Sequence, residues 1–290
     1  MDNTHGFHIE DRILINYDGS ESNIVLPAGI VKIGSTAFMG KNVQNVIVPE
    51  GVVSIGRAAF AYSHLTSISL PNSIKDFGDA VFSYCLNLKK ISIPNGVERI
   101  ESGIFTNSSL ECIDLPDSIK WIKYHSFFGT AIQTIHLPSS INVIDEGAFM
   151  SCWELTEITL PDNIRALVKD TFKNCWNLQR ITLPSQLTKL DLSAFDGCSG
   201  LCEFITSSKS IKFVAPDGVL YNRKMTELVK YPAGKKDSRY SVPKSVTKIR
   251  KTAFQRAKHL KQLIVPSHLK ECVEHICLPG NEFTIEFAEN

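Results

Sequence analysis

Prolines recur every 22 or 23 residues through most of this chain, and this spacing restricts the possible folds more than any other feature. A period between about 20 and 50 residues is typical of solenoids, in which each repeat is one coil that packs only against its neighbours. The sequence therefore predicts an elongated stack of coils. The marker prolines are Pro27, Pro49, Pro71, Pro94, Pro116, Pro138, Pro161 and Pro184, and Pro243 and Pro266 bound a further copy.

Each repeat has the same parts in the same order. Before the proline, a stretch such as 155–160 alternates apolar and polar residues, as a short half-buried strand does. The proline removes a backbone donor and fixes φ, so it ends the strand and turns the chain to the opposite side of the coil. There, Ile141, Ile144 and a Glu-Gly-Ala-Phe turn supply a second wall.

The Ala-Phe step of each turn recurs at the same place in every repeat, which predicts one internal column of stacked phenylalanines. The pairs are Ala37-Phe38, Ala59-Phe60, Val81-Phe82, Ile104-Phe105, Phe127-Phe128, Ala148-Phe149, Thr171-Phe172, Ala194-Phe195 and Ala253-Phe254.

The strand motif Leu-x-x-Ile-x-Leu-Pro, joined to Ile-x-x-Ile-x-x-x-Ala-Phe-x-x-Cys, resembles the BspA-like class of leucine-rich repeat proteins over about residues 20 to 270. The resemblance implies an α/β fold: a right-handed solenoid curved like a horseshoe, with a parallel concave sheet and short helical or 3₁₀ turns on the convex side. It also implies a non-catalytic binding scaffold, and members of the family often act as adhesins at cell surfaces. The 22-residue coils depart from the pattern because they lack the cysteine.

The array is interrupted once, where the segment 201–206 lacks its closing proline. Short β-rich runs separated by Asp-Gly and Pro-Ala-Gly follow, which predicts a hairpin and a return strand. The N-terminus resembles this unit, with 7–15 corresponding to 213–221. We therefore expect an N-terminal β cap at 1–26, a repeat array at 27–206, a hairpin island at 207–242, and terminal repeats with a C-terminal cap at 243–290. The alternating run 283–287 is the expected capping strand.

The cysteines favour a structural role over disulfide or metal chemistry. Four of them occupy the same small-residue slot, fourteen residues after the repeat's proline, and are expected to be buried free thiols; they are Cys85, Cys152, Cys175 and Cys198. A second group has zinc-binding atoms within ten residues, but its spacing fits no standard structural zinc pattern, so no metal site is predicted. This second group is His268, Cys272, His275 and Cys277.

No sequence motif for catalysis or cofactor binding is present: there is no nucleophile elbow, no zinc-protease helix and no phosphate loop. Asp114 and His136 fall on neighbouring predicted strands and could exchange protons, but two solvated residues on a sheet surface are the simpler interpretation. We therefore predict a non-enzymatic protein without a cofactor.

The outward positions of the predicted sheet and its rim are the candidate protein-binding surface. The strand face is polar and mixed in charge, so it could hold an extended partner by many modest contacts or be an ordinary solvated face. Trp153 and Trp176 occupy equivalent rim positions of adjacent coils, where they are either anchors for a partner or apolar cover. The candidates on the face are Lys90, Asp114, His136, Glu157, Thr159, Arg180 and Thr182.

Charge is segregated along the chain, although the formal net charge is only +1. Residues 1–206 hold 15 basic and 22 acidic side chains, residues 207–270 hold 16 and 3, and the last twenty hold five acidic ones. The alternative function is therefore binding of an acidic polymer by the segment 207–270, without sequence-specific nucleic-acid recognition. Its candidate residues are Arg223, Lys224, Lys235, Lys236, Arg250 and Lys251.

The sequence leaves the location of the protein open. The first residues have no basic flank followed by an apolar run, so they predict no secretory signal, and no stretch is apolar enough for a transmembrane segment. The chain as it stands predicts a cytoplasmic protein, whereas the resemblance implies secretion or surface display.

Overall fold

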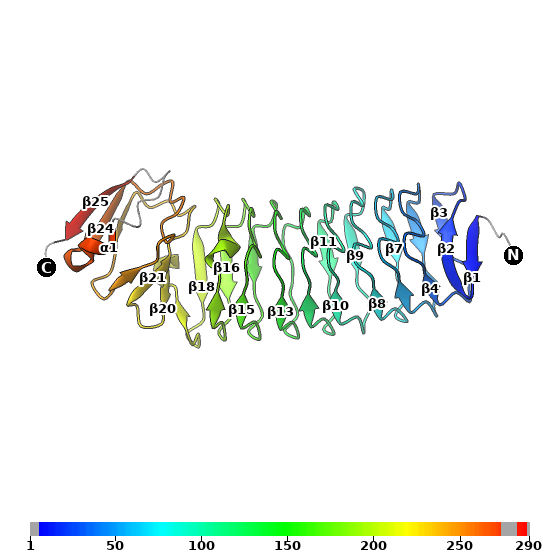
Figure 1. Cartoon of the computed structure of the whole chain (residues 1–290), viewed down its shortest axis with the longest axis horizontal. Coiled ribbons are helices and arrows are strands. Elements are labelled where there is room, and N and C mark those ends of the chain that lie inside the picture. Colours follow the sequence, from blue (N-terminus) through cyan, green and yellow to red (C-terminus); the bar gives the residue numbers. More distant parts are fainter. Residues whose placement is uncertain (1–5, 274–282, 289–290) are drawn as a thin grey trace.

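The computed structural model describes residues 6–273 and 283–288 as a row of stacked coils. Figure 1 shows the coils side by side along the long axis, with the two ends of the chain at opposite ends of the molecule. In this view the row is closer to a straight rod than to a horseshoe. Within the described residues, no helix has both the length and the apolarity that crossing a bilayer requires.

The strands of the coils form two separate ladders rather than one sheet. The pre-proline ladder contains β3 (Asn23–Val25), β5 (Asn45–Ile47), β7 (Ser67–Ser69), β9 (Lys90–Ser92), β11 (Cys112–Asp114), β14 (Glu157–Thr159), β16 (Arg180–Leu183) and β18 (Glu203–Thr206). The opposite, post-proline ladder contains β2 (Ile13–Tyr17), β4 (Lys32–Ile33), β6 (Ser54–Ile55), β8 (Asp76–Phe77), β10 (Arg99–Ile100), β12 (Trp121–Ile122), β13 (Val143–Ile144), β15 (Ala166–Leu167) and β17 (Lys189–Leu190). Its strands are paired in three groups, from β2 to β8, from β10 to β13, and β15 with β17. Pairs within both ladders are parallel and in register, as in Ile158 opposite Ile181.

The prediction of an α/β fold is wrong, because the described structure has almost no helix and most turns between the two ladders are not helical. Most contain two residues with positive φ, four positions apart, such as Ala58 at +52° and Tyr62 at +59°. A left-handed residue at each end prevents a right-handed helix from forming. The described helical segments are η1 (Leu192–Phe195), η2 (Pro216–Gly218), η3 (Ser267–Leu269) and α1 (Lys270–Val273).

The turns instead pair with the next coil, so they add a third line of hydrogen bonds between coils. Alternate backbone N–H groups donate forward, as Phe60 N–H does to the Val81 carbonyl at 3.0 Å and Tyr62 N–H to the Ser83 carbonyl at 2.9 Å. The intervening N–H groups close local turns, as Ala61 does to Ala58 at 3.1 Å. Where both ladders are also paired, a coil is thus held to its neighbour on three sides.

The predicted phenylalanine column is present, with one correction. Rings of successive coils stack with centroids 4.9 to 6.4 Å apart from Phe38 to Phe195. Phe127, not Phe128, belongs to this column, and the small residue before it is the buried Ser126. Phe128 lies outside, where its ring stacks on His125 at 5.0 Å.

The four slot cysteines are buried and free, as predicted. Each thiol donates to the carbonyl of the column phenylalanine in the preceding coil, for example Cys152 Sγ to Phe127 at 3.0 Å and Cys175 Sγ to Phe149 at 3.0 Å. Burial raises the pKa of Cys85 to about 11 and that of Cys152 to about 12. These thiols therefore stay protonated and tie adjacent coils together.

Antiparallel hairpins occur at both ends of the array. At the N-terminus β1 (Phe7–Glu10) pairs with β2, and further on β19 (Phe213–Val214), β20 (Leu220–Asn222) and β21 (Glu227–Lys230) form a meander that leads into β23 (Lys248–Ile249). The structural equivalent of β1–β2 is therefore β20–β21, because both hairpins end in a parallel pair, so the correspondence of 7–15 with 213–221 is wrong. The last ladder joins β22 (Arg239–Ser241), β24 (Gln262–Pro266) and the predicted strand β25 (Thr284–Ala288).

Candidate functional site

The pre-proline face divides into a part with internally paired polar groups and a part without. Toward the N-terminus, Asn45 Nδ2 donates to Asn23 Oδ1 at 2.5 Å, and Ser67 Oγ donates to Asn45 Oδ1 at 2.6 Å. Further along, Lys90 Nζ lies 3.5 Å from Asp114 Oδ2, which also accepts from Ser92 Oγ at 2.9 Å. The candidates Lys90 and Asp114 therefore satisfy each other.

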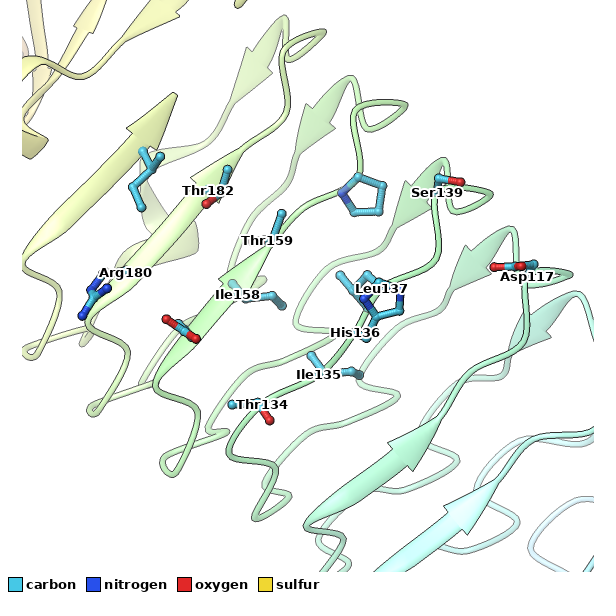
Figure 2. A pocket seen from close by; sticks show the side chains of 13 residues that line it. Asp117, Thr134, Ile135, His136, Leu137, Ser139, Ile158, Thr159, Arg180 and Thr182 are labelled. Carbon is cyan, nitrogen blue, oxygen red and sulfur yellow. The ribbon is translucent and has the colours of Figure 1, made fainter. Parts of the chain in front are cut away.

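The pre-proline strands are not paired between β7 and β9, and a wider interruption follows β11. The next coil would contribute a strand at Thr134–His136, but this segment is not paired, and the ladder resumes only at β14. Figure 2 shows the segment without a strand arrow beside β14 and β16. Among the described residues, no backbone hydrogen bond joins Leu137 to Thr159, whereas the equivalent bond one coil later, from Leu160 N–H to the Thr182 carbonyl, is 3.0 Å long.

A groove of about 670 Å³ opens at this interruption. Its volume lies within the range of about 300–1,000 Å³ that is usual for ligand sites. The lining includes five of the predicted face residues. Figure 2 labels four of them, His136, Thr159, Arg180 and Thr182, on adjacent coils. The lining residues are Asp117, Thr134, Ile135, His136, Leu137, Ser139, Glu157, Ile158, Thr159, Pro161, Arg180, Thr182 and Ile205.

Within the part of the chain that the structure describes, the polar side chains at the centre of the groove have no hydrogen-bond or ion-pair partner. Arg180 lies between Glu157 and Glu203 in the strand register, yet within the described residues no ion pair or hydrogen bond engages any of the three side chains. The same is true of the side chains of Thr159 and Thr182. The groove therefore combines two kinds of lining. Ile135 and Ile158 are apolar, and beside them lie a guanidinium, carboxylates and hydroxyls that have no partner among the described residues.

Trp153 and Trp176 form the predicted pair at the edge of this face. Their ring centroids are 6.4 Å apart, and the residues are 39% and 55% exposed. They do not line the groove. Each lies four residues before a groove residue, Glu157 and Arg180 respectively, so the pair stands at the corner where the chain enters β14 and β16.

A second exposed aromatic pair, Tyr62 and Tyr84, was not among the sequence candidates. Their rings stack at 4.5 Å on the turns, several coils before the tryptophans. The equivalent positions of other coils hold Gly40, Asn107 and Gly129, which tolerate positive φ better than tyrosine does. An alignment of the repeats shows these two tyrosines at a turn position that otherwise holds Gly or Asn in those coils, so the exposed pair could have been predicted from the sequence.

The basic segment is partly neutralised within the fold. Glu227 Oε1 lies 3.1 Å from Arg250 Nε and 3.5 Å from Lys248 Nζ. Burial raises the pKa of Glu227, but the hydrogen bond and charge of Arg250 and the charge of Lys248 outweigh it and lower that pKa overall. Lys235 pairs with Asp237 at 3.2 Å, while Arg223, Lys224, Lys236 and Lys251 are exposed.

The described residues provide no metal site and do not join Asp114 to His136. No group of three or more His, Cys, Asp or Glu side chains there could hold a metal ion. His268 Nε2 lies 2.7 Å from the Val246 carbonyl, and the side chain of Cys272, together with His275 and Cys277, lies outside the described part. Asp114 and His136 share no hydrogen bond in the structure, since Asp114 pairs with Lys90 and Ser92.

Comparison with known proteins gives one family and a fold. The family model of the BspA type leucine rich repeat region matches residues 9–131, 120–228 and 234–278. A leucine-rich cell surface protein from Faecalibacterium prausnitzii A2-165 is 21% identical, with a TM-score of 0.51 over 98% of this chain and 93% of that one. A leucine-rich repeat protein from Bacteroides ovatus ATCC 8483 is also 21% identical, with a TM-score of 0.55 over 96% and 87%. None of the curated proteins matches this chain.

Proposed function

Because the chain belongs to the BspA type of leucine-rich repeat proteins, we propose that it is a binding scaffold that holds a protein partner in the groove between β14, β16 and the segment 134–137. Leucine-rich repeat proteins generally bind other proteins, and their stacked coils offer long surfaces for doing so. The tryptophan pair at the entrance to β14 and β16 extends the proposed surface beyond the groove.

One observation carries this proposal: among the described residues, several polar side chains of the pre-proline face that line the groove lack internal partners. Elsewhere on that face, pairs such as Lys90 with Asp114 already satisfy each other. Arg180 and Glu157 have no such pairing among the described residues, so a partner can engage them without first breaking bonds within the protein. Arginine and tryptophan are also the side chains most enriched among residues that dominate binding energy.

We also propose that the binding is adhesin-like, directed at proteins of a surface or matrix. The support is the resemblance to the BspA-like family and the similarity in fold to the F. prausnitzii protein described as a cell surface protein. The acidic-polymer alternative has weaker support, because Glu227 and Asp237 already neutralise part of the basic segment.

The test is capture of purified matrix proteins such as fibronectin, fibrinogen and laminin by the immobilised protein. Arg180→Glu reverses the central groove charge and should reduce capture at least tenfold, and replacing Trp153 and Trp176 together by Ala should reduce it further. The matched control is Lys90→Glu, a charge reversal on the same face outside the groove. Equal capture by wild type and by the Arg180 variant would reject the groove as the site.

A further inference from the structure

The exposed rings of Tyr62 and Tyr84 are not needed to cover the core. Each tyrosine lies two residues after a column phenylalanine, at a turn position that Gly40 fills in the preceding coil. The column ring of that coil, Phe38, is nevertheless fully buried. The tyrosines themselves are 51% and 37% exposed, so their rings form part of the surface and not of the interior.

The local backbone does not favour tyrosine at either position. Both residues are in the left-handed region, and the cost of holding two residues with a Cβ atom there exceeds what one stacked aromatic pair usually returns. Glycine or asparagine is better suited to this conformation, and Gly40 and Asn107 occupy it in the coils on either side of the pair. Folding alone therefore does not account for the two rings.

One face of the Tyr62 ring is free. The ring of Tyr84 lies parallel to the other face, with the centroids 4.5 Å apart. On the free side the preceding coil has Gly40, and a Cβ added there would have no atom within 4 Å apart from its own chain neighbours. By contrast, the Asn107 amide reaches so close to Gly129 that a Cβ there would collide with it. The place beside Tyr62 is thus vacant, at the coil spacing of about 4.8 Å that suits one more stacked ring.

Unpaired polar groups surround this vacant place. The hydroxyl groups of Tyr62 and Tyr84 have no hydrogen-bond partner among the described residues. Asn42 and His64 follow Gly40 and Tyr62 by two residues and are exposed, and no hydrogen bond engages their side chains within the described chain. An amide, an imidazole and two phenols are therefore available to hydroxyl groups of a ligand.

We infer that this aromatic platform binds a glycan, with one β-linked glucose ring stacked on the free face of Tyr62 in the place beside Gly40. Such a ring has C–H groups on its faces and hydroxyl groups around its edge. The C–H groups carry partial positive charge and match the negative face of the aromatic ring, while the hydroxyls can bond to Asn42 and His64. Because Gly40 has no side chain, the bound ring keeps its second face in water, which suits a sugar with a hydroxylated edge better than an apolar side chain of a protein.

The probes are cellohexaose and laminarihexaose, two β-linked glucose oligomers, titrated onto the full chain and followed by saturation-transfer difference NMR. We expect saturation of the axial protons of one ring face. Tyr62→Asn removes the ring but keeps a residue that this backbone accepts, as Asn107 shows, so binding should weaken at least tenfold. Tyr62→Phe keeps the stacking face, and binding should change less than threefold.

Gly40→Asn tests the vacant place without altering either ring. Asparagine tolerates the φ of +68°, and no atom obstructs its Cβ, so the fold should be retained while the new side chain occupies the place of the sugar. Binding should weaken at least tenfold. The matched control is Gly29→Asn, in the same repeat, where φ is +87° and an added Cβ again meets no atom within 4 Å. This control should leave binding unchanged, and thermal unfolding of each variant checks that it is folded.

Several outcomes would overturn the inference. No saturation transfer to either oligomer at millimolar concentration would reject β-glucan binding, and unchanged binding by Tyr62→Asn or Gly40→Asn would place the sugar elsewhere. Loss of oligomer binding in Arg180→Glu would move it to the groove. Loss of matrix-protein capture in Tyr62→Asn, without glycan binding by the wild type, would assign the rings to a protein partner. Loss of that capture in Arg180→Glu alone concerns the proposed function and leaves the glycan site intact.

Discussion

The rings of Tyr62 and Tyr84 stack with their planes 7° apart, although both residues have the left-handed backbone conformation, with φ of +59° and +56°. This conformation costs a residue with a Cβ atom about 1–2 kcal/mol, and glycine avoids most of that cost. The two tyrosines thus hold an exposed aromatic surface on strained backbone, and strain of this kind has direct consequences for mutational stability.

The strain at position 62 should reverse the usual order of stability, in which an alanine variant is more stable than a glycine variant. Both Tyr62→Ala and Tyr62→Gly lose the ring, but only glycine relieves the backbone, so we expect the glycine variant to be more stable by about 1 kcal/mol despite its larger unfolded-state entropy. Chemical denaturation measures the difference. At Leu86, an exposed position without positive φ, alanine should be the more stable variant, and the same order at both sites would contradict the strain.

The buried slot residue Ser108 offers a stabilising substitution. Its hydroxyl is buried without a hydrogen-bond partner, whereas the longer cysteine side chain in the same slot reaches the phenylalanine carbonyl of the preceding coil. Ser108→Cys should therefore donate to the Phe82 carbonyl and raise the free energy of unfolding by about 1–2 kcal/mol. Cys198→Ser is the reverse change and should lower it. A destabilised Ser108→Cys protein would show that the slot cannot take a thiol in 22-residue coils.

The thiol column predicts a loss of stability at alkaline pH. Burial raises the pKa of Cys85 from its ordinary value of 9.0 to about 11, and those of Cys152 and Cys198 to about 12. The folded state therefore keeps these thiols protonated to a higher pH than the unfolded chain does. Stability is fully present below pH 9 and falls as the pH rises toward the folded values, by about 1.4 kcal/mol per pH unit for each thiol. Unfolding of the wild type and of Cys152→Ala from pH 8 to 11 measures the slope, which the variant should reduce.

The register of the aromatic column can be tested at two adjacent residues. Phe127 is fully buried between Phe105 and Phe149, so Phe127→Ala should cost about 3–5 kcal/mol. Phe128 is partly exposed and contacts His125, so Phe128→Ala should cost about 1 kcal/mol. Similar losses at the two positions would place both rings in the core.

Charge compensation by Glu227 should limit the affinity for polyanions. Glu227→Gln removes the partner of Arg250 and Lys248, so the variant is expected to elute from heparin at higher salt than the wild type. Asp11→Asn, a neutralisation of the same size on the N-terminal hairpin, is the control. Elution of Glu227→Gln at the wild-type position would remove the basic segment from consideration as a polyanion site.

The repeat pattern alone determined the stacked coils, the phenylalanine column and the burial of Cys85 and its equivalents, because a period of 22 or 23 residues places like residues on top of one another. It could not fix the conformation of the turns. Tyr62, Asn107 and Gly129 share a left-handed slot, and that requirement comes from pairing with the next coil rather than from local propensity. The sequence also left the register of the aromatic column open by one residue, so Phe128 was predicted where the structure has Phe127.

The proposed binding face could be predicted from the alternation of the strand, which directs His136, Thr159 and Arg180 outward whatever the details of pairing. The groove did not. The segment 134–137 has the same pattern as the strands around it, so sequence predicts a continuous ladder there. Only the packing of whole coils decides where neighbouring backbones approach closely enough to bond, and the groove lies where the described structure has no such bond between Leu137 and Thr159.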